Sequence, residues 1–173
     1  MNVSTKEPKT RNCILTNNDV LRRIRYAFDF KDSTMIEIFA LADFDATQEQ
    51  VSSWLKKDDD SHFLKLSGSD LAAFLNGFIN FKRGKREGEQ PKPEKKLNNN
   101  MILQKLRIAL NLKADDVIEV FKLAGFRISP HELSAFFRSP ESKNYRECKD
   151  QILRNFLVGI QLQQRPNDQG SDL

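Results

Sequence analysis

The sequence predicts an all-α protein made of two tandem homologous four-helix repeats that pack with pseudo-twofold symmetry. Three observations support this prediction. Apolar residues recur at helical spacing along most of the chain. No segment shows the strict apolar and polar alternation of a half-buried strand, and no Asn-Gly or Asp-Gly hairpin turn is present. The chain also matches itself when it is shifted by 82 positions.

The shift places residues 17–83 on residues 99–165 without a gap, and 18 of the 67 aligned residues are identical. Many of the other pairs are conservative, and Trp54, for example, meets Phe136. We therefore interpret the chain as a tandem duplication. Residues shared by the halves indicate a shared structural need, and unshared residues are candidates for specialisation.

Four helices are predicted in each half. Apolar residues at helical spacing mark the first helix, and the same positions are apolar in the second half: Val20, Ile24, Ala27 and Phe28 against Ile102, Leu106, Ala109 and Leu110. The second helix carries Met35, Ile38, Phe39 and Ala42 against Val117, Val120, Phe121 and Ala124. The fourth carries Leu71, Phe74, Leu75 and Phe78 against Leu153, Phe156, Leu157 and Ile160.

The clearest local signals are those that start the helices. The third helices begin with capping boxes, Thr47 with Gln50 and Ser129 with Glu132, and Pro130 takes the first helical position. We expect Asn18 and Asn100 to cap the first helices, and Ser33 and Asp115 to cap the second.

Two glycines occupy the same place inside the fourth helices. Gly77 and Gly159 cost a helix up to about 1 kcal/mol relative to alanine, so their presence in both halves indicates close approach of another helix. We expect them at the seam between the halves.

These features divide the chain into five segments. Residues 1–14 are predicted to be a disordered extension, 15–83 the first repeat, 84–98 a basic flexible linker, 99–165 the second repeat and 166–173 a disordered tail. Each repeat is near the lower size limit of a self-sufficient core, so we expect the two to pack on each other.

The basic surplus of the chain is local. There are 28 Lys and Arg against 24 Asp and Glu, and residues 82–96 alone hold seven basic and three acidic side chains. The rest of the chain is therefore neutral, whereas duplex-binding domains usually carry a basic face within the fold.

Composition also bears on location and redox chemistry. Every apolar run is far shorter than the ~18 residues of a membrane-spanning helix, and the first residues are polar rather than signal-like. Only Cys13 and Cys148 are present, which favours free thiols in the cytoplasm. Cys148 aligns with Leu66, so we interpret it as a small buried hydrophobic residue rather than a nucleophile.

Several strings resemble a known family. TNNDVLRRIRYAFDF, FLNGFINFKRGK, NNNMILQKLRIALNLKADDVIEVFKLAGFRIS and NYRECKDQILRNFLVG are similar to the YehS-like family of small bacterial proteins, whose duplicated domain has no known function. The resemblance covers residues 15–165 and departs in the two terminal segments. It implies a bacterial cytoplasmic protein with a duplicated domain, and it transfers no catalytic residue.

The sequence shows no arrangement of residues typical of an enzyme. Asp58, Asp59 and Asp60 are consecutive and do not project to one point, and neither His62 nor His131 has a Cys or His at ligand spacing. Neither glycine-rich phosphate-binding motif occurs. We therefore expect no catalysis, no metal and no cofactor.

Two charged pairs recur in both halves. Arg25 with Glu37, and Arg107 with Glu119, are predicted to form ion pairs that join the first helix of each half to the second. The alternative is that these arginines contact a ligand.

Two kinds of macromolecular partner remain open, and a third possibility is an enzyme or a binder of a small metabolite, because a helical pocket need not carry a linear motif. The main hypothesis is a non-enzymatic helical module that binds a protein, because paired amphipathic helices offer grooves. The alternative is a nucleic-acid-binding or regulatory protein that uses the first helices and the linker to contact RNA or DNA. Phe81 is the aromatic residue that falls outside the core pattern. The candidate residues for that alternative are basic: Arg22, Arg23, Arg25, Lys82, Arg83, Lys85, Arg86, Lys105 and Arg107.

Overall fold

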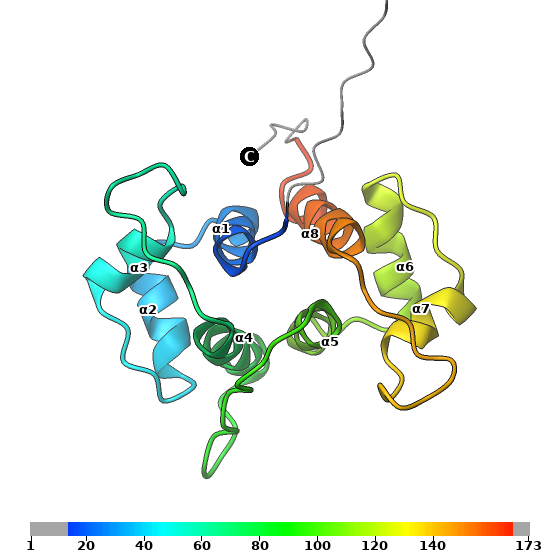
Figure 1. The fold of residues 1–173 in the computed structure, drawn as a ribbon, viewed down its shortest axis with the longest axis horizontal. Helices are drawn as coiled ribbons and strands as arrows, with labels where there is room; N and C mark the ends of the chain where they lie inside the picture. The colour runs from blue at the N-terminus through cyan, green and yellow to red at the C-terminus, as the bar shows by residue number, and fades with distance from the viewer. Residues whose placement is uncertain (1–13, 168–173) are drawn as a thin grey trace, which may run out of the picture.

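The computed structural model describes residues 14–167, and within this range it contains eight α-helices and no strand. The predicted all-α class is confirmed. Four helices form the centre of the molecule: α1 (Asn17–Phe28), α4 (Gly68–Arg83), α5 (Asn99–Ala109) and α8 (Asp150–Gln164) (Figure 1). Helices α2 (Asp32–Ala40) and α3 (Gln48–Trp54) cover one side, and α6 (Ala114–Leu123) and α7 (Pro130–Phe136) cover the other.

The two halves exchange equivalent contacts. Helix α4 of the first half packs against α5 of the second, and α8 of the second half packs against α1 of the first. These two pairs use the same helix positions with the halves exchanged, which is the pattern that a pseudo-twofold axis produces. The prediction of two repeats packed with pseudo-twofold symmetry is therefore confirmed.

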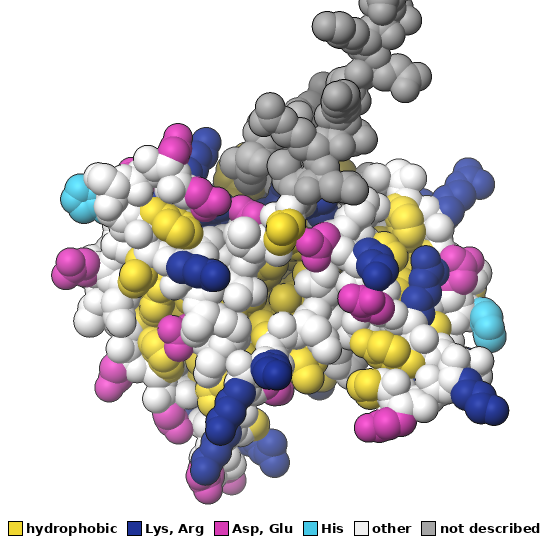
Figure 2. Space-filling model, viewed as in Figure 1, with side chains coloured by type: hydrophobic (Ala, Val, Ile, Leu, Met, Phe, Trp, Pro, Cys, Tyr) yellow, Lys and Arg dark blue, Asp and Glu magenta, His cyan; other side chains and the backbone are white. Residues whose placement is uncertain are grey.

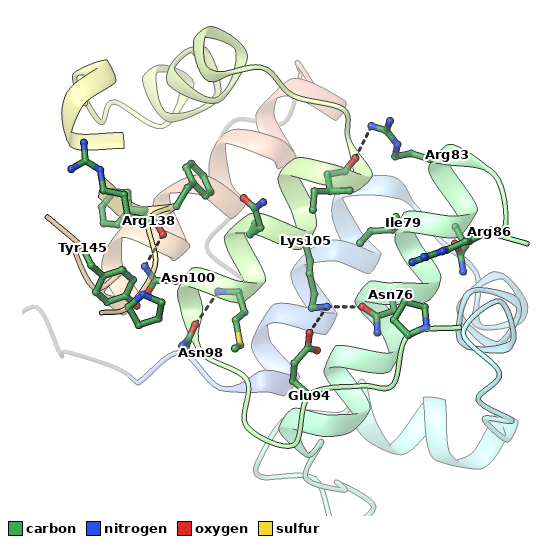
Figure 3. Close-up of a pocket in the computed structure, with 18 of the residues that line it drawn as sticks. Asn76, Ile79, Arg83, Arg86, Glu94, Asn98, Asn100, Lys105, Arg138 and Tyr145 are labelled. Atoms are coloured by element: carbon green, nitrogen blue, oxygen red, sulfur yellow. Dashed lines mark hydrogen bonds and ion pairs between the residues drawn. The ribbon is translucent and has the colours of Figure 1, made fainter. Parts of the chain in front are cut away.

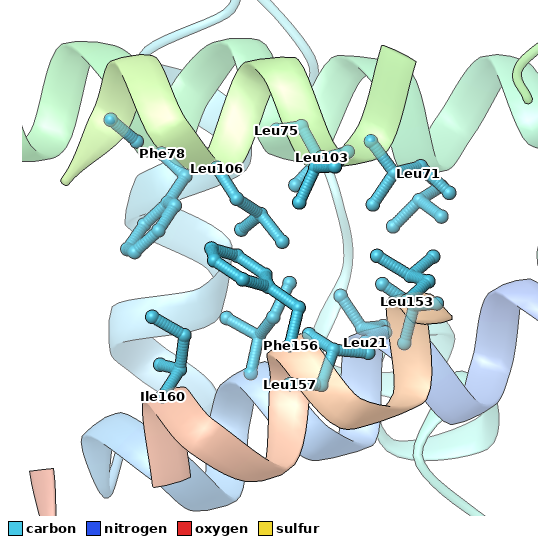
Figure 4. Close-up of a cluster of buried hydrophobic side chains, with 14 of the residues drawn as sticks. Leu21, Leu71, Leu75, Phe78, Leu103, Leu106, Leu153, Phe156, Leu157 and Ile160 are labelled. Carbon is cyan, nitrogen blue, oxygen red and sulfur yellow. The ribbon is translucent and has the colours of Figure 1, made fainter. Parts of the chain in front are cut away.

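One apolar core joins the halves. Leucine and phenylalanine side chains from all four central helices point toward one another (Figure 4). Leu21, Phe78, Leu103 and Phe156 represent the four helices, and each of these side chains is buried. Helices in this arrangement bury one stripe each, as the apolar spacing of the sequence predicts.

The predicted caps of the third helices are confirmed. The Thr47 hydroxyl accepts the Gln50 N–H, and the Gln50 side chain accepts the Thr47 N–H. In α7 the Ser129 hydroxyl accepts the Glu132 N–H and donates to the Glu132 carboxylate at 2.9 Å. Pro130 starts the helix, as predicted.

The predicted caps of the first and second helices are wrong by two positions. Thr16 caps α1 and Asn98 caps α5. Helix α2 begins at Asp32 and α6 at Ala114, so Ser33 and Asp115 lie inside the first turn. Propensity alone does not separate neighbouring polar residues, because the cap is the one whose backbone is still extended.

Asn18 and Asn100 are instead buried and hold the loop that follows the third helix of each half. The Asn18 amide donates to Trp54 O and Leu64 O, both at 2.9 Å, and its oxygen accepts the Leu66 N–H. Asn100 makes the three equivalent bonds in the second half, to Phe136 O, Arg146 O and the Cys148 N–H. A loop without secondary structure thus has its buried backbone groups paired by one side chain.

The two helical glycines do mark a close approach, but their place at the seam is wrong. A Cβ at Gly77 would lie 1.9 Å from Ile38 O, and one at Gly159 would lie 2.1 Å from Val120 O. Ile38 is in α2 and Val120 is in α6, so each glycine faces a helix of its own half. Helices α4 and α8 line the seam with their other side.

Across residues 14–167, no helix is long and apolar enough to cross a membrane. The predicted terminal segments lie almost entirely outside the described residues.

Candidate functional site: a groove between α4, α5 and the linker

A groove of about 680 Å³ runs beside the α4–α5 seam. Its walls come from α4, from α5, from linker residues 84–98 and from the loop that follows α7. Cavities of roughly 300–1,000 Å³ with a mostly apolar lining and a few polar groups are typical of binding sites.

One face of α5 is left uncovered in this groove. Met101, Gln104, Lys105 and Ile108 follow helical spacing and all line the groove. Met101 is 37% exposed and Ile108 is 38% exposed, although both are large apolar residues. Ile79 of α4 extends this apolar surface.

A polar cluster interrupts the apolar lining. The Lys105 ammonium donates to Asn76 Oδ1 at 2.6 Å and lies 3.0 Å from Glu94 Oε1 (Figure 3). Asn76 comes from α4 and is only 8% exposed, Lys105 comes from α5, and Glu94 comes from the linker. Within residues 14–167, Asn76 Nδ2 and Glu94 Oε2 are buried and have no hydrogen-bond partner. Buried polar groups are nearly always paired, so two such atoms at one contact are unusual.

Cations surround the cluster on both sides. Arg138 and Tyr145 lie on one side of Lys105, and Arg86 lies on the other (Figure 3). Arg83 also lines the groove, and Glu94 is the one acidic residue among the lining residues. The groove is therefore apolar along its length and positively charged at its edges.

The linker is held to the body at several points. Gln90 is buried, accepts from Asn80 Nδ2 at 2.8 Å and donates to Arg86 O at 2.8 Å. The Arg86 N–H donates to Asn80 Oδ1 at 3.3 Å, and Glu94 provides a further point through Lys105. The segment that the sequence predicts as a flexible linker thus forms one wall of the groove.

The nine basic candidates do not converge on one surface. Lys105, Arg83 and Arg86 line the groove, whereas Arg22, Arg23 and Arg25 line a second cavity beside α1. Helices α1 and α5 lie on opposite sides of the central bundle (Figure 1).

The remaining candidates are spread along the ends of helices. Lys82 lies over the Phe28 ring at 4.7 Å, and Lys85 is 3.9 Å from Asp43. On the face of Figure 2, Lys and Arg side chains gather over the protruding linker and otherwise lie singly among acidic and uncharged side chains.

The predicted ion pairs of the shared arginines are wrong. Arg107 Nε donates to Leu112 O at 3.2 Å, and its guanidinium lies over the Phe137 ring at 4.6 Å. Glu119 is exposed and pairs with Lys122. Arg25 Nε is buried, and it has no hydrogen-bond partner in the described part of the chain. The pairs fail because α2 and α6 turn their shared glutamates toward solvent.

A different shared arginine joins the halves. Arg83 Nη1 donates to Asn111 Oδ1 at 2.7 Å and to Ile108 O at 3.2 Å. Ile108 lies in the last turn of α5, and Asn111 lies just beyond its end. Arg165 makes the equivalent contact, with its Nη2 3.1 Å from Asp29 Oδ1 and its guanidinium over the Tyr26 ring. The identity of Arg83 and Arg165 in the sequence therefore reflects two symmetric clamps across the seam.

The second cavity is the pseudo-symmetric counterpart of the groove, but it lacks the polar cluster. It also has a volume of about 680 Å³ and lies beside the α1–α8 seam. The shift of 82 replaces Asn76 by Val158 and Lys105 by Arg23. The cluster is thus a feature of one seam only, which makes it a candidate for specialisation.

The other residues whose side chains could take part in catalysis or metal binding lie outside the groove. Cys148 is buried, and this burial, together with the nearby Asp150 and Glu147 carboxylates, raises the pKa of its thiol to about 12. His62 and His131 are exposed. In the part of the chain that the structure describes, no three His, Cys, Asp or Glu side chains come together as metal ligands would.

Sequence reasoning missed Asn76 and Glu94. A signal for Asn76 was present, because this amide interrupts the apolar run LAAFLNGF and meets Val158 in the other half. No such signal marks Glu94, because it lies in the linker, which also contains Glu87 and Glu89.

Comparisons with known proteins agree with the duplication. The family model described as "Protein of unknown function (DUF1456)" matches residues 17–84 and again residues 99–165. The "Uncharacterized protein YehS" of Escherichia coli strain K12 is 42% identical over 151 residues, which cover 87% of this chain and 97% of that protein. No solved structure matches the chain. The resemblance noted in the sequence is confirmed, and the chain belongs to the DUF1456 family, with one family domain in each half.

Proposed function

We propose that this protein is a cytoplasmic, non-enzymatic binding module that holds an acidic, amphipathic segment of a partner protein in the groove beside α4 and α5. The single observation that carries this proposal is the uncovered face of α5, where Met101 and Ile108 remain exposed beside Lys105. Clustered apolar exposure with a polar rim is typical of interaction sites.

The charge of the groove favours an acidic segment. Arg83, Arg86, Lys105 and Arg138 line it against the single carboxylate of Glu94. Apolar side chains of the partner would contact Met101 and Ile108, and its acidic side chains would face the cations. Apolar contact supplies most of the affinity in such grooves, and charge complementarity supplies selectivity and association rate.

A nucleic-acid partner is less well supported. The basic candidates lie on opposite sides of the central bundle, and several outside the groove already contact other side chains, as Lys82 does with Phe28 and Lys85 with Asp43. A protein surface that binds the phosphate backbone of a nucleic acid needs cations arranged along one continuous path.

Selection from a phage-displayed library of short random peptides tests the proposal. We expect the selected peptides to combine Asp or Glu with Leu or Phe. Their synthetic forms should bind Ile108→Glu at least about tenfold more weakly than wild type, because a buried carboxylate would oppose both the apolar contact and the acidic residues.

Leu123→Glu is the matched control. Leu123 is 50% exposed on α6 and does not line the groove, so this variant adds the same charge elsewhere and should bind as wild type does. Selection of no peptides, or of peptides that bind Ile108→Glu unchanged, would overturn the proposal. Salt-sensitive binding of single-stranded RNA or duplex DNA in place of peptides would support the nucleic-acid alternative.

A further inference from the structure

We infer that Lys105 and Asn76 form a subsite for a carboxylate of the bound segment, and that Glu94 of the linker occupies this subsite until the segment displaces it. The inference rests on the proposed function and specifies the chemistry of its groove. It assigns to the linker the role of an internal competitor.

The first support is the unsatisfied amide of Asn76. This side chain is more than nine-tenths buried and lines the groove, yet no described residue accepts from its Nδ2. A buried donor without an acceptor destabilises the free protein, so a ligand that supplies the acceptor gains affinity.

The second support is the imperfect fit of Glu94. Its Oε1 lies 3.0 Å from the Lys105 ammonium, but its Oε2 is buried with no partner in the described residues. One carboxylate oxygen of Glu94 thus contacts a donor and the other does not, while Nδ2 of Asn76 has no acceptor in the described residues. An incoming carboxylate can use both oxygens, one on the Lys105 ammonium and the other on Asn76 Nδ2.

The third support is the difference in position and exposure between the two sides of the contact. Asn76 and Lys105 lie on packed helices, and the Lys105 side chain is 13% exposed. Glu94 lies on the linker, between helices, and its side chain is 36% exposed. Displacing Glu94 therefore leaves the donors in place and costs no helix packing.

The geometry also specifies the ligand class. One ammonium and one amide offer two donors to two acceptor oxygens, which fits a carboxylate, whereas a phosphate group usually collects several cations or backbone amides. Arg83, the α4 cation that lines the groove, is already bonded to Asn111 and Ile108, and Arg138 donates to Ser134 Oγ at 3.4 Å.

Small probes test the subsite directly. We would titrate 15N-labelled full-length protein with 3-phenylpropanoate and with the neutral 3-phenylpropanamide, and follow the Asn76 side-chain amide and the Met101 and Ile108 backbone signals. The carboxylate should bind about tenfold more tightly than the amide, the difference expected for one charge-assisted hydrogen bond.

Glu94→Gln provides the decisive variant. Removing the competing charge should tighten 3-phenylpropanoate several-fold and leave 3-phenylpropanamide unchanged. Glu89→Gln is the matched control, because Glu89 is an exposed acid of the same linker that does not line the groove. An equal gain in Glu89→Gln, or no gain in Glu94→Gln, would overturn the inference.

The two proposals fail in different ways. If both probes shift the α5 signals equally and Glu94→Gln has no effect, the groove binds apolar groups and the carboxylate subsite is refuted. If peptides and probes alike leave the α5 signals unmoved, the proposed function itself is refuted.

A last pair of probes identifies the source of the carboxylate. N-acetylphenylalanine carries the carboxylate of a chain end, and N-acetyl-aspartyl-phenylalanine amide carries that of a side chain. Tighter binding of the first assigns the subsite to a C-terminus, and tighter binding of the second assigns it to an internal acidic residue.

Discussion

The asparagine pair at the start of α1 and α5 has a larger structural role than its position suggests. Asn18 and Asn100 each satisfy three backbone groups, one at the end of the third helix and two in the loop that follows it. Their identity in both halves was visible in the sequence, and it correctly indicated a shared need. The sequence could not show which need, because a polar residue at a helix start can cap the helix or turn inward toward another segment.

Replacing these asparagines should cost more than replacing the true caps. Asn18→Ala and Asn100→Ala should each lower the free energy of unfolding by about 3 kcal/mol, because each removes the partner of two buried backbone groups and one part-buried backbone group. Thr16→Ala and Asn98→Ala should lower it by about 1 kcal/mol, the usual value for a lost cap. Guanidinium denaturation followed by circular dichroism measures all four. Equal losses in the two sets would show that the loop bonds contribute no more than a cap.

The shared arginines show where residue-level reasoning reached its limit. The sequence predicts ion pairs of Arg25 with Glu37 and of Arg107 with Glu119, because both halves carry the same arginine and the same glutamate. A repeat identifies a constrained residue but not its partner, since the rotation of each helix decides which side chains meet. Arg83, one of the candidate residues for nucleic-acid binding, instead bonds across the seam to Asn111.

At the scale of elements, the fit of α4 against α2 and of α8 against α6 depends on the absence of a side chain. The sequence revealed the two glycines and the structure supplies the partners, Ile38 O and Val120 O. Periodicity identifies which residues are apolar, and it says nothing about which neighbouring helix comes closest. For this reason the existence and order of the helices could be predicted, while the contact made by the glycines could not.

Gly77→Ala should therefore destabilise the protein although alanine is the better helix former. Propensity alone predicts a gain of up to about 1 kcal/mol. The added Cβ, 1.9 Å from a backbone oxygen, forces the helices apart at a cost of about 3 kcal/mol, the upper end of the usual range for overpacking. Thermal and guanidinium denaturation distinguish these outcomes by sign.

Gly68→Ala is the control within the same helix. A Cβ there would lie 3.5 Å from Leu97 Cβ, an ordinary contact, so this variant should be neutral or slightly more stable. Gly159→Ala should behave as Gly77→Ala does. A stable Gly77→Ala would mean that α2 can move away from α4 without loss.

The groove shows why elements and sites differ in predictability. Its apolar wall is made of Met101, Ile108 and Ile79, which lie outside the apolar stripes of α4 and α5. Its polar cluster joins one residue from each of these helices to one from the linker. Asn76 and Glu94 have no identical counterpart in the other half, so the internal alignment offered no second example. A comparison of the two halves cannot identify a site whose residues differ between them.

At the scale of the whole molecule, the pseudo-twofold axis makes the order of the halves along the chain irrelevant to packing. Helices α4 and α5 meet at one seam, and α8 and α1 meet at the equivalent seam. The first pair is joined by residues 84–98. By symmetry, a connection of that length also suffices between the end of α8 and the start of α1. Residues 165–173 and 1–16 together form a longer connection than this.

A circular permutant should therefore fold. Opening the chain between Lys95 and Lys96, which are both exposed, and joining residue 173 directly to residue 1 keeps Gln90 and Glu94 attached to α4. We expect native helical content and one cooperative unfolding transition, with stability within about 2 kcal/mol of the natural order, because loop-closure entropy changes slowly with length. Circular dichroism and calorimetry measure both properties.

A permutant cut inside α4 between Phe74 and Leu75 serves as the control and should not fold, since it divides a buried helix of the shared core. Two separate transitions in the first permutant would show that the halves are independent bodies, and the central four-helix core would then not be the unit that folds.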